Sequence, residues 1–529
     1  MRKSIKKVVS TALTASMVMS MTAVAWAGST DEEVKVTYPL ETEDELTIWS
    51  CGNLRPESSY VDWTESPFHT GLEKMTGIHV EWQFASDPSD EASAYNLMLT
   101  DDVLPDMIFY SMSATDAQEY IEDGMIYDLT EYLPKYAPDY WAYLTENPQL
   151  QKYVKTADGA FFGFGTFIEG DYNKTYTGPA VRQDWLDECG LEAPVTLEDW
   201  ENMLVTFKEK YGARLGFTEQ RFGNASALAS GTGAMATWNG TWYADDDGKI
   251  QYAQAQPEWK EYMSVLNKWW EMGLIDEDSI TMSDADMRTK VANNEIGATS
   301  TAMSQITNYL ADAEATESGA QWVGIEYPRT AEGEPTCMIQ TNTSYNNNVA
   351  VVTTSCPEDR LITALAWLNY GYSEEGMTYW NFGEEGVSYT VDEDGNYAWT
   401  DVVNEDPKGL NAAISKYSGT LWAGISVQAS KLVEMKNNPV SAAAVYKWVE
   451  NTEVEKHYVP SLALGVEEGI EYGDLITNIK EVTKTAALEF ITGDRSLDEF
   501  DAFVEELNAL GLERCQEIQQ DAYDTFMGN

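Results

Sequence analysis

The sequence has few of the residues on which catalysis usually depends. Its three histidines, His69, His79 and His457, are scattered, and no P-loop, G-x-S-x-G or H-E-x-x-H pattern occurs. A loose G-x-G-x-x-A at residues 231–236 follows no clear strand. We therefore predict that the protein is not an enzyme and carries no cofactor. A glycosidase is not excluded by counting, because 88 acidic residues make accidental carboxylate pairs inevitable.

Cysteine is also scarce. Five cysteines occur, and none has the spacing of a metal site. An odd number cannot all pair within one molecule. We therefore predict no bound metal, and we expect buried free thiols for most of the set: Cys51, Cys189, Cys337, Cys356 and Cys515.

Basic residues are few as well. The chain has 33 Lys and Arg against 88 Asp and Glu, which gives a formal net charge of −55. Nucleic acids and anionic membranes need clustered Lys and Arg to neutralise phosphate, so neither is expected as a partner. An acidic excess of this kind mainly favours solubility.

The amino terminus has the three parts of a secretory signal. Residues 2–7 contain four basic residues, residues 8–23 are mostly apolar, and residues 25–27 form an A-x-A cleavage site. An uncleaved membrane anchor is the alternative, but no second apolar run of that kind follows. We predict a signal peptide over residues 1–27, a mature chain beginning near Gly28, and an acidic leader over residues 28–45.

Strand and helix patterns alternate after the leader. Residues 46–50, 78–84 and 107–110 have strand patterns, separated by helical patterns at 71–75 and 92–99. This alternation predicts an α/β fold with a covered, mainly parallel sheet, which binds ligands at the carboxyl ends of its strands. The chain is longer than one hydrophobic core normally supports, so we expect two lobes.

Later elements are indicated by capping and turn signals. Residues 349–352 are apolar without alternation, which predicts a strand covered on both faces. Capping boxes at Ser355 with Glu358, and at Ser496 with Glu499, predict helix starts, the first helix ending near Gly371. We also expect a helix capped by Thr196, hairpins around residues 241–253 and 393–400, a helix at 257–272, a strand at 296–303 and a helical tail.

Aromatic residues are abundant, with 18 Trp, 30 Tyr and 15 Phe. A sugar presents flat C–H faces and a rim of hydroxyls, so its site needs aromatic platforms and paired polar groups. Most aromatics are core residues, but those in polar loops or at strand ends are better candidates. The best candidates are Trp238 and Trp422, then Trp242, Tyr345 and Trp380, with Asn53, Arg55 and Tyr110 following or ending the first and third strands.

Four stretches have a recognisable pattern. The first, SCPEDRLITALAWLNYGYSEEGMTYWNFGEEGVSY at residues 355–389, contains S-E-E-G and G-x-E-G, and the others are residues 181–200, 245–278 and 491–526. In this order they resemble the extracellular solute-binding proteins of family 1, the binding subunits of ABC importers, and most closely the large oligosaccharide-binding branch. Arg182 and Glu385 fall on motif positions: Arg182 either contacts ligand or makes a buried ion pair, and Glu385 either grips a hydroxyl or fixes its loop.

The resemblance implies a two-lobed periplasmic-binding-protein type II fold with a ligand cleft between the lobes. By analogy, residues 46–166 with 344–395 form the N-terminal lobe, and residues 167–343 with 396–529 form the C-terminal lobe and helical tail. Some members carry a calcium loop after the helix that here ends near Tyr211, but this sequence has no such loop there.

The resemblance further implies a monomer that captures an oligosaccharide and delivers it to the transmembrane subunits of an ABC permease. The location it implies is the cell surface of a Gram-positive-type bacterium, although the lipid-anchored cysteine usual at the cleavage site is missing here. Cys51 does not replace it, because a charged segment precedes it. Two alternatives stay open: a binding protein for a non-sugar solute such as a peptide, and a secreted carbohydrate-active enzyme.

Overall fold

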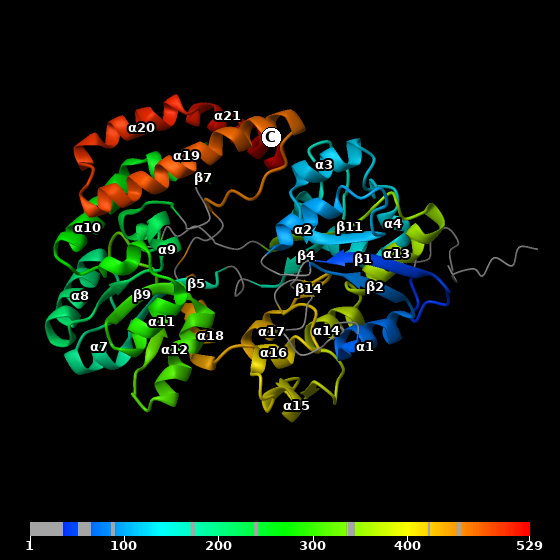
Figure 1. The fold of residues 1–529 in the computed structure, drawn as a ribbon, viewed down its shortest axis with the longest axis horizontal. Coiled ribbons are helices and arrows are strands. Elements are labelled where there is room, and N and C mark those ends of the chain that lie inside the picture. The colour runs from blue at the N-terminus through cyan, green and yellow to red at the C-terminus, as the bar shows by residue number, and fades with distance from the viewer. Residues whose placement is uncertain are drawn as a thin grey trace, which may run out of the picture.

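The computed structural model describes residues 35–50, 65–85, 90–170, 175–236, 242–334, 336, 344–421, 424–450, 452 and 456–528. These residues form two α/β lobes, each built on its own sheet, and the C-terminal helices run along one side of both (Figure 1). Within the described ranges, no helix is long and apolar enough to span a membrane.

The first lobe is built on a six-stranded sheet. Its strands in spatial order are β14 (Val427–Gln428), β4 (Phe164–Ile168), β11 (Tyr345–Val352), β3 (Met107–Ser111), β1 (Glu45–Ser50) and β2 (His79–Gln83). β11 runs antiparallel to its neighbours β3 and β4, whereas the other strands are parallel to one another. The expected mainly parallel sheet is therefore confirmed.

The second half of β11 lies at the centre of this lobe. Residues 349–352 are fully buried. Successive side chains of a strand point to opposite faces. Ala350 and Val352 accordingly pack in the cluster that contains Ile48, whereas Val349 and Val351 pack in the cluster that contains Trp49. The prediction of a strand covered on both faces is confirmed.

Short and medium helices cover this sheet. They are α1 (Pro67–Thr76), α2 (Glu91–Met98), α3 (Ala114–Glu122), α4 (Leu133–Tyr136), α5 (Pro138–Glu146), α6 (Pro148–Gln151), α13 (Glu358–Tyr370) and α14 (Glu374–Phe382). The short helices α15 (Asp401–Asn404) and α16 (Leu410–Ile414) pack in a separate cluster with Phe382 at the end of α14. The hairpin of β12 (Tyr389–Val391) and β13 (Tyr397–Trp399) forms at the second predicted turn.

The start of α13 differs from the prediction. The helix begins at Glu358, and its N-cap residue Pro357 makes no side-chain cap bond. Ser355 Oγ instead accepts a hydrogen bond from the backbone N–H of Leu104, 3.0 Å away. The predicted capping box is therefore wrong, because the serine side chain accepts its hydrogen bond from a donor that is distant in sequence. The predicted helix end near Gly371 is confirmed.

The second lobe is built on a four-stranded sheet of β10 (Trp322–Gly324), β5 (Thr177–Arg182), β9 (Ile296–Ala302) and β6 (Arg214–Gly216). β6 is parallel to β9, whereas β5 is antiparallel to both β9 and β10. Its helices are α7 (Gln183–Cys189), α8 (Leu197–Tyr211), α9 (Glu219–Asn224), α10 (Pro257–Glu271), α11 (Asp284–Ala292), α12 (Met303–Ala315) and α18 (Pro439–Val449).

Local signals in the second lobe predicted its elements well. Thr196 caps α8 in a complete capping box with Asp199. β7 (Trp242–Ala244) and β8 (Ile250–Tyr252) form the first predicted hairpin, with Gly248 in the left-handed region of its turn. α10 and β9 agree with their predicted bounds to within one residue.

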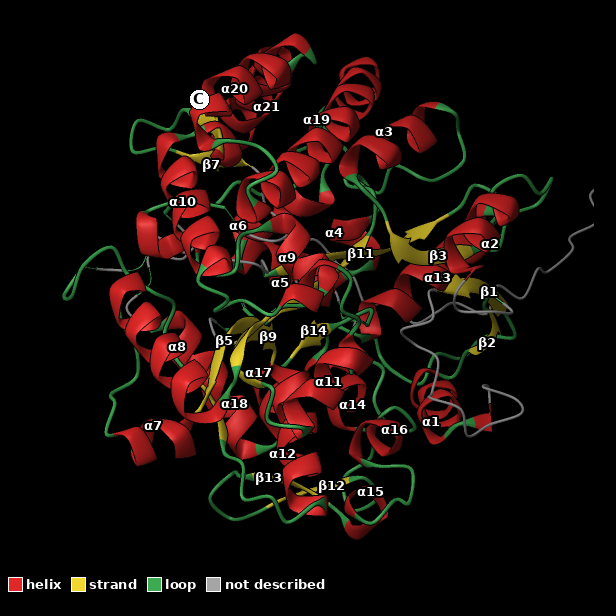
Figure 2. Ribbon diagram, turned by 60° about the vertical axis from the view of Figure 1, so that its left-hand side comes forward, coloured by secondary structure: helices red, strands yellow, loops and turns green. Residues whose placement is uncertain are grey.

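The C-terminal segment forms a layer of three helices, α19 (Val466–Thr492), α20 (Phe500–Ala509) and α21 (Leu512–Met527). Figure 2 shows them together, with α3 of the first lobe beside α19. Phe490 and Phe503 pack against Trp259 of α10, which joins the layer to the second lobe. The second predicted capping box is wrong, because Ser496 accepts from Asp498 and begins a short 3₁₀ turn.

The helical layer also touches the first lobe. The backbone N–H of Leu464 donates to Thr115 Oγ1 of α3 at 3.0 Å. Lys152 Nζ donates to the backbone carbonyl of Phe526 at 2.5 Å and lies 4.6 Å from the centre of its ring. The tail therefore belongs to the second lobe by its core but has contacts with both lobes.

The position of β14 indicates where the chain leaves the first lobe for the second. It pairs with β4 in the first sheet, and Val427 is buried in the core of the first lobe. Trp399, Ile414 and Leu421 pack in one cluster with Phe382 at the end of α14. We therefore propose that the first lobe extends to about residue 428, beyond the boundary at residue 395 expected from the resemblance. α17 (Ser430–Met435) then leads to the second lobe.

The end of the expected acidic leader is attached to the first lobe. The Tyr38 hydroxyl donates to the carbonyl of Ala366 in α13 at 2.6 Å. Leu40 is buried, and its backbone N–H donates to the carbonyl of Thr76 at 2.7 Å. Residues 1–34, including the expected signal peptide, lie outside the described residues.

Candidate functional site

One edge of the first sheet is the candidate binding edge of this lobe. All its parallel strands have their carboxyl ends there, Ser50 ending β1 and Ser111 ending β3. β11 begins there, since Asn348 pairs with Ser111. Ligands of open α/β sheets bind beyond the carboxyl ends of the strands. A ligand of this lobe is therefore expected at the edge where Ser50 and Ser111 lie.

Three connections between the lobes start from this same edge. The chain passes from the end of β4 to the start of β5, returns to the start of β11, and crosses again after β14 through α17 to α18. α18 is anchored in the second lobe, where Trp448 Nε1 donates to the carbonyl of Pro179 at 2.9 Å. Because the connections leave one edge together, small backbone rotations in them can move one lobe relative to the other.

The corresponding edge of the second sheet carries a cluster that the sequence analysis missed. β6 and β9 end at this edge and β5 begins there, since the first residue of β5 pairs with the last residue of β9. Arg221 of α9 follows β6 and lies near Tyr176, which precedes β5, near Tyr327, which follows β10, and near Tyr309 of α12. The Asp284 carboxylate of α11 is also close to it. We call Arg221 and the three tyrosines the Arg221 cluster.

The chemistry of the Arg221 cluster suits a polar ligand with flat apolar faces. Burial lowers the pKa of the Arg221 guanidinium, but an arginine keeps its charge in proteins. Tyr327 is held in place because its hydroxyl donates to the carbonyl of Thr177 at 2.8 Å. A guanidinium offers donors in a planar fork, and the partly exposed Tyr176 ring offers a face to C–H groups, whereas the rings of Tyr309 and Tyr327 are buried. This combination can bind adjacent hydroxyls of a sugar ring.

Two predicted aromatics lie at the edge of the first sheet. Tyr345 begins β11, is 5% exposed, and stacks on Tyr153 with ring centres 5.4 Å apart. Burial raises the pKa of Tyr345. Tyr110 stacks on Tyr95 at 4.2 Å and meets Trp49 edge-on at 5.4 Å. Tyr110 lies at the predicted end of the third strand, whereas Tyr345 begins β11 four residues before the strand predicted at residues 349–352. Ligand contact by both residues stays a prediction.

Two predicted tryptophans lie in hydrophobic cores. Trp242 is 8% exposed in the core of the second lobe, and its Nε1 donates to the Tyr472 hydroxyl at 2.8 Å. Trp380 is 2% exposed in the core of the first lobe, with Phe68 edge-on at 5.0 Å. Their packing matches the core role that most aromatics have, and contact with a ligand stays a prediction for both.

Arg182 makes the buried ion pair that was one of its two expected roles. Its Nε and Nη2 donate to Asp184 at 2.8 and 2.6 Å, its Nη1 donates to Asn294, and its guanidinium lies 4.0 Å from the centre of the Trp185 ring. Burial opposes ionisation of Asp184, but Arg182 holds the pKa of this carboxyl below its usual value. Arg182 ends β5, at the opposite end of the strand from the connections.

Glu385 lies apart from the strand ends. It is exposed, in the turn after α14, where its backbone forms an isolated bridge with Tyr389. It lines a pocket made entirely by the first lobe. The remaining candidates, Asn53, Arg55, Trp238 and Trp422, lie outside the described residues and stay predictions.

Within the ranges the structure describes, no group of three or more His, Cys, Asp or Glu side chains could hold a metal ion. Cys189, Cys356 and Cys515 are free thiols, the last two buried. Cys51 and Cys337 lie outside the described ranges.

Two α/β lobes joined by several connections at the candidate binding edge define a protein of the two-lobed periplasmic-binding-protein type. The solved structure of an HMO-binding, ABC-transporter-associated solute-binding protein from Bifidobacterium longum infantis has this fold. It aligns with a TM-score of 0.75 and 18% identity over 91% of this chain and 98% of that one. The structure of the alginate-binding protein AlgQ2 aligns with a TM-score of 0.70 and 19% identity, over 91% of this chain and 98% of that one. The expected fold class is therefore confirmed.

Residues 69–382 match the family described as bacterial extracellular solute-binding protein, and the chain belongs to this family. Among similar proteins, the fructooligosaccharide ABC transporter substrate-binding protein FusA of Streptococcus pneumoniae is 27% identical over 48% of this chain. The matched segment spans about half of FusA, 49% of its length. The polygalacturonan/rhamnogalacturonan-binding protein YtcQ of Bacillus subtilis is 22% identical over 85% of this chain and 87% of its own length.

Proposed function

We propose that the protein is the extracellular substrate-binding subunit of an ABC importer and that it captures an oligosaccharide between its lobes. The Arg221 cluster is the observation that carries this proposal. It places a guanidinium and three tyrosines at the edge of the second sheet, next to the connections from the carboxyl ends of the first sheet. The names of FusA, YtcQ and the HMO-binding protein, all similar to this chain, support a carbohydrate as the ligand.

In this proposal the protein binds without making or breaking a bond. The ligand contacts both lobes only when they are closed, so it favours the closed state by the difference between its contacts in the two states. The permease of the importer recognises that closed state. An affinity near 1 μM, about −8 kcal/mol, is enough for capture and still permits release.

The proposal includes location and assembly. The chain is secreted after loss of residues 1–27, acts as a monomer at the cell surface of a Gram-positive-type bacterium, and contacts the transmembrane subunits of its permease. Each lobe keeps its own core during closure, the first lobe with residues to about 428 and the second with the helical tail.

Thermal unfolding with a panel of sugars tests the proposal. The mature chain from Gly28 is heated with neutral or acidic oligosaccharides, and the sugars are followed by mass spectrometry in the same tubes. A bound ligand at 100 times its dissociation constant is expected to add about 2.7 kcal/mol of stability. We expect one class of oligosaccharide to raise the unfolding midpoint and to stay intact.

Other outcomes of the panel separate the alternatives. Shortened sugars would identify an enzyme and contradict the binding role. No response to any sugar, with a rise for peptides, would identify a binding protein for a non-sugar solute.

A further inference from the structure

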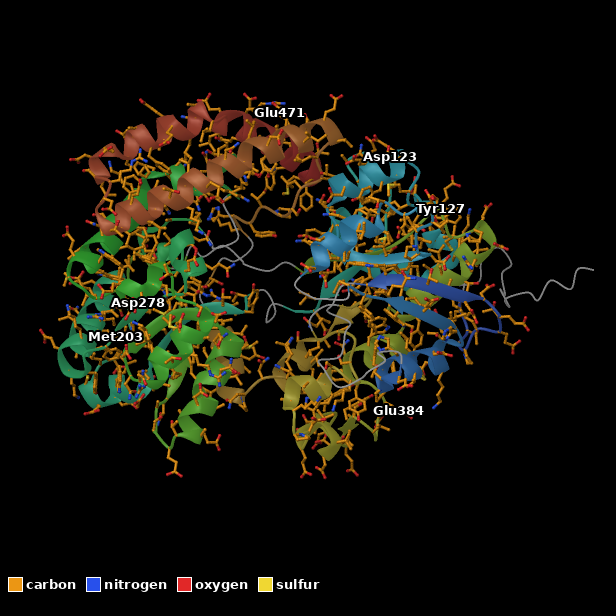
Figure 3. The ribbon with its side chains drawn as sticks, in the orientation of Figure 1. Asp123, Tyr127, Met203, Asp278, Glu384 and Glu471 are labelled. Carbon is orange, nitrogen blue, oxygen red and sulfur yellow. The ribbon has the colours of Figure 1, made fainter. Side chains whose placement is uncertain are left out.

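A pocket of about 590 Å³ lies in the first lobe, away from the strand ends. It is formed by α1, α14 and the turn that follows α14, without any residue of the second lobe. Figure 3 places Glu384, one of its lining residues, on the opposite side of the molecule from Glu471 in the C-terminal helices. Pockets of this volume hold small molecules. Because one lobe forms it completely, the pocket does not depend on lobe closure.

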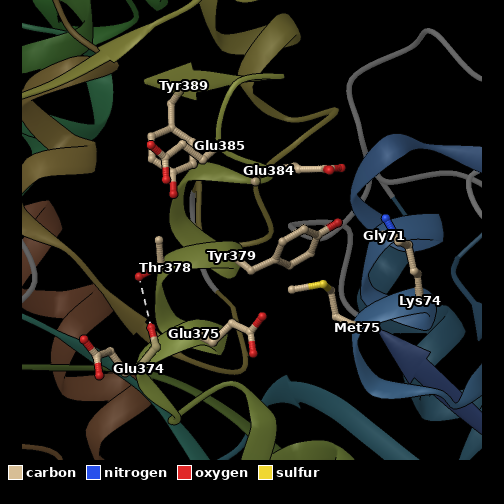
Figure 4. Close-up of a pocket in the computed structure, with 11 residues that line it drawn as sticks. Gly71, Lys74, Met75, Glu374, Glu375, Thr378, Tyr379, Glu384, Glu385 and Tyr389 are labelled. Atoms are coloured by element: carbon tan, nitrogen blue, oxygen red, sulfur yellow. Dashed lines mark hydrogen bonds between the residues drawn. The ribbon is translucent and has the colours of Figure 1, made fainter. Parts of the chain in front are cut away.

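The pocket is lined with four exposed carboxylates and a single lysine. Glu374, Glu375, Glu384 and Glu385 line it with one lysine, Lys74. None of the four carboxylates has a salt bridge to any described residue. In Figure 4 the side chains of Glu375 and Glu384 lie on either side of the Tyr379 ring. The pocket therefore carries an excess of negative charge around an aromatic ring.

A buried tyrosine completes the lining. Tyr389 is 4% exposed and lines the pocket beside Glu385 (Figure 4). Its ring is held by stacking on Tyr397 at 5.5 Å, whereas its hydroxyl has no hydrogen-bond partner among the described residues. The hydroxyl oxygen is accessible to solvent, so a ligand N–H in the pocket can donate a hydrogen bond to it in place of water.

The residues that line the pocket indicate what kind of ligand it can bind. No group of three or more potential metal ligands lies together in the described ranges, so a single metal ion does not fit the arrangement. Tyr379 offers an aromatic ring and Met75 an apolar side chain between the separated carboxylates. Ammonium groups are attracted to carboxylates and to aromatic faces, and an aliphatic chain between two such groups packs against apolar atoms.

We propose that this pocket binds an organic cation that carries ammonium groups on an aliphatic chain. Glu375 and Glu384 bind the ammonium groups, the Tyr379 ring and Met75 contact the chain, and Tyr389 accepts a hydrogen bond from an N–H. Free polyamines and the lysine side chains of a partner polypeptide both present this chemistry. The site is separate from the proposed oligosaccharide site and does not require it.

Titration calorimetry with spermidine tests the site. A chain with a net charge of −55 attracts any cation, so the titration is done at about 0.15 M salt, where charges are screened beyond roughly 8 Å. We expect saturable binding at one site. The double variant E375Q/E384Q and the single variant Y389F are each expected to weaken it about tenfold, with little change in thermal midpoint.

The matched control is E209Q/E271Q, which removes the same charge from exposed positions in α8 and α10. Equal weakening in the control, or no saturable binding of spermidine or of a short lysine peptide, would overturn the proposal. Binding of the lysine peptide alone, lost in E375Q/E384Q, would support the site and assign it to a partner polypeptide. Oligosaccharide binding is expected to be unchanged in the pocket variants, so this test and that of the transport role can fail independently.

Discussion

Replacing Arg221 with alanine is expected to weaken oligosaccharide binding about 10- to 100-fold. The guanidinium lies at the edge of the second sheet among Tyr176, Tyr309 and Tyr327, where we propose that it donates to sugar hydroxyls. Hydrogen bonds from a charged donor contribute about 1.5–3 kcal/mol, which corresponds to that range of affinity. Calorimetry with the sugar found in the panel measures the change.

Two further variants make this result specific. Arg288→Ala removes a cation from the same lobe that is paired at the surface with Asp312, and it is expected to leave affinity unchanged. Arg221→Lys keeps the charge but loses the planar fork, so we expect an intermediate loss. Unchanged affinity in Arg221→Ala, or an equal loss in Arg288→Ala, would show that the Arg221 cluster is not part of the binding site.

Replacing Gly376 with alanine is expected to lower the free energy of unfolding by about 3 kcal/mol or more. Gly376 is the glycine of the S-E-E-G stretch and lies in the first turn of α14. A Cβ atom there would lie 1.6 Å from the backbone carbonyl oxygen of Tyr370, at the end of α13. Neither atom can rotate away, so the helix α14 must shift from the core that it shares with α13.

The control for this substitution is Gly473→Ala in the middle of α19. A Cβ atom at Gly473 meets nothing within 4 Å. Alanine has the higher helix propensity, so this variant is expected to be more stable by about 0.5–1 kcal/mol. Urea unfolding of both variants measures the two changes with opposite signs. A neutral Gly376→Ala would mean that α13 and α14 do not approach as closely as the structure describes.

The sequence predicted elements correctly where the determining contacts are local. Thr196 and Asp199 are three residues apart and cap α8 through each other's side chains and backbone N–H groups. The same pattern failed at Ser355, because the serine accepts from Leu104, far away in sequence. A capping box can be recognised from spacing, but a competing tertiary donor cannot.

Lobe assignment and site prediction depend on contacts between distant segments. β14 has only two residues, too few for a recognisable pattern, yet its pairing with β4 attaches the preceding segment to the first sheet. The Arg221 cluster draws its members from before β5, from α9, from α12 and from after β10. No sequence spacing connects them. The end of the third strand at Tyr110 could be predicted to within one residue, because a strand end is a local feature.

Small-angle X-ray scattering of the mature chain, with and without the oligosaccharide that stabilises it, tests the central claim most directly. The account predicts a smaller radius of gyration at saturating sugar, because the ligand contacts both lobes and favours their closed arrangement. It also predicts that the sugar is recovered intact. An unchanged radius of gyration with sugar bound would contradict the proposal that an oligosaccharide is captured between the lobes.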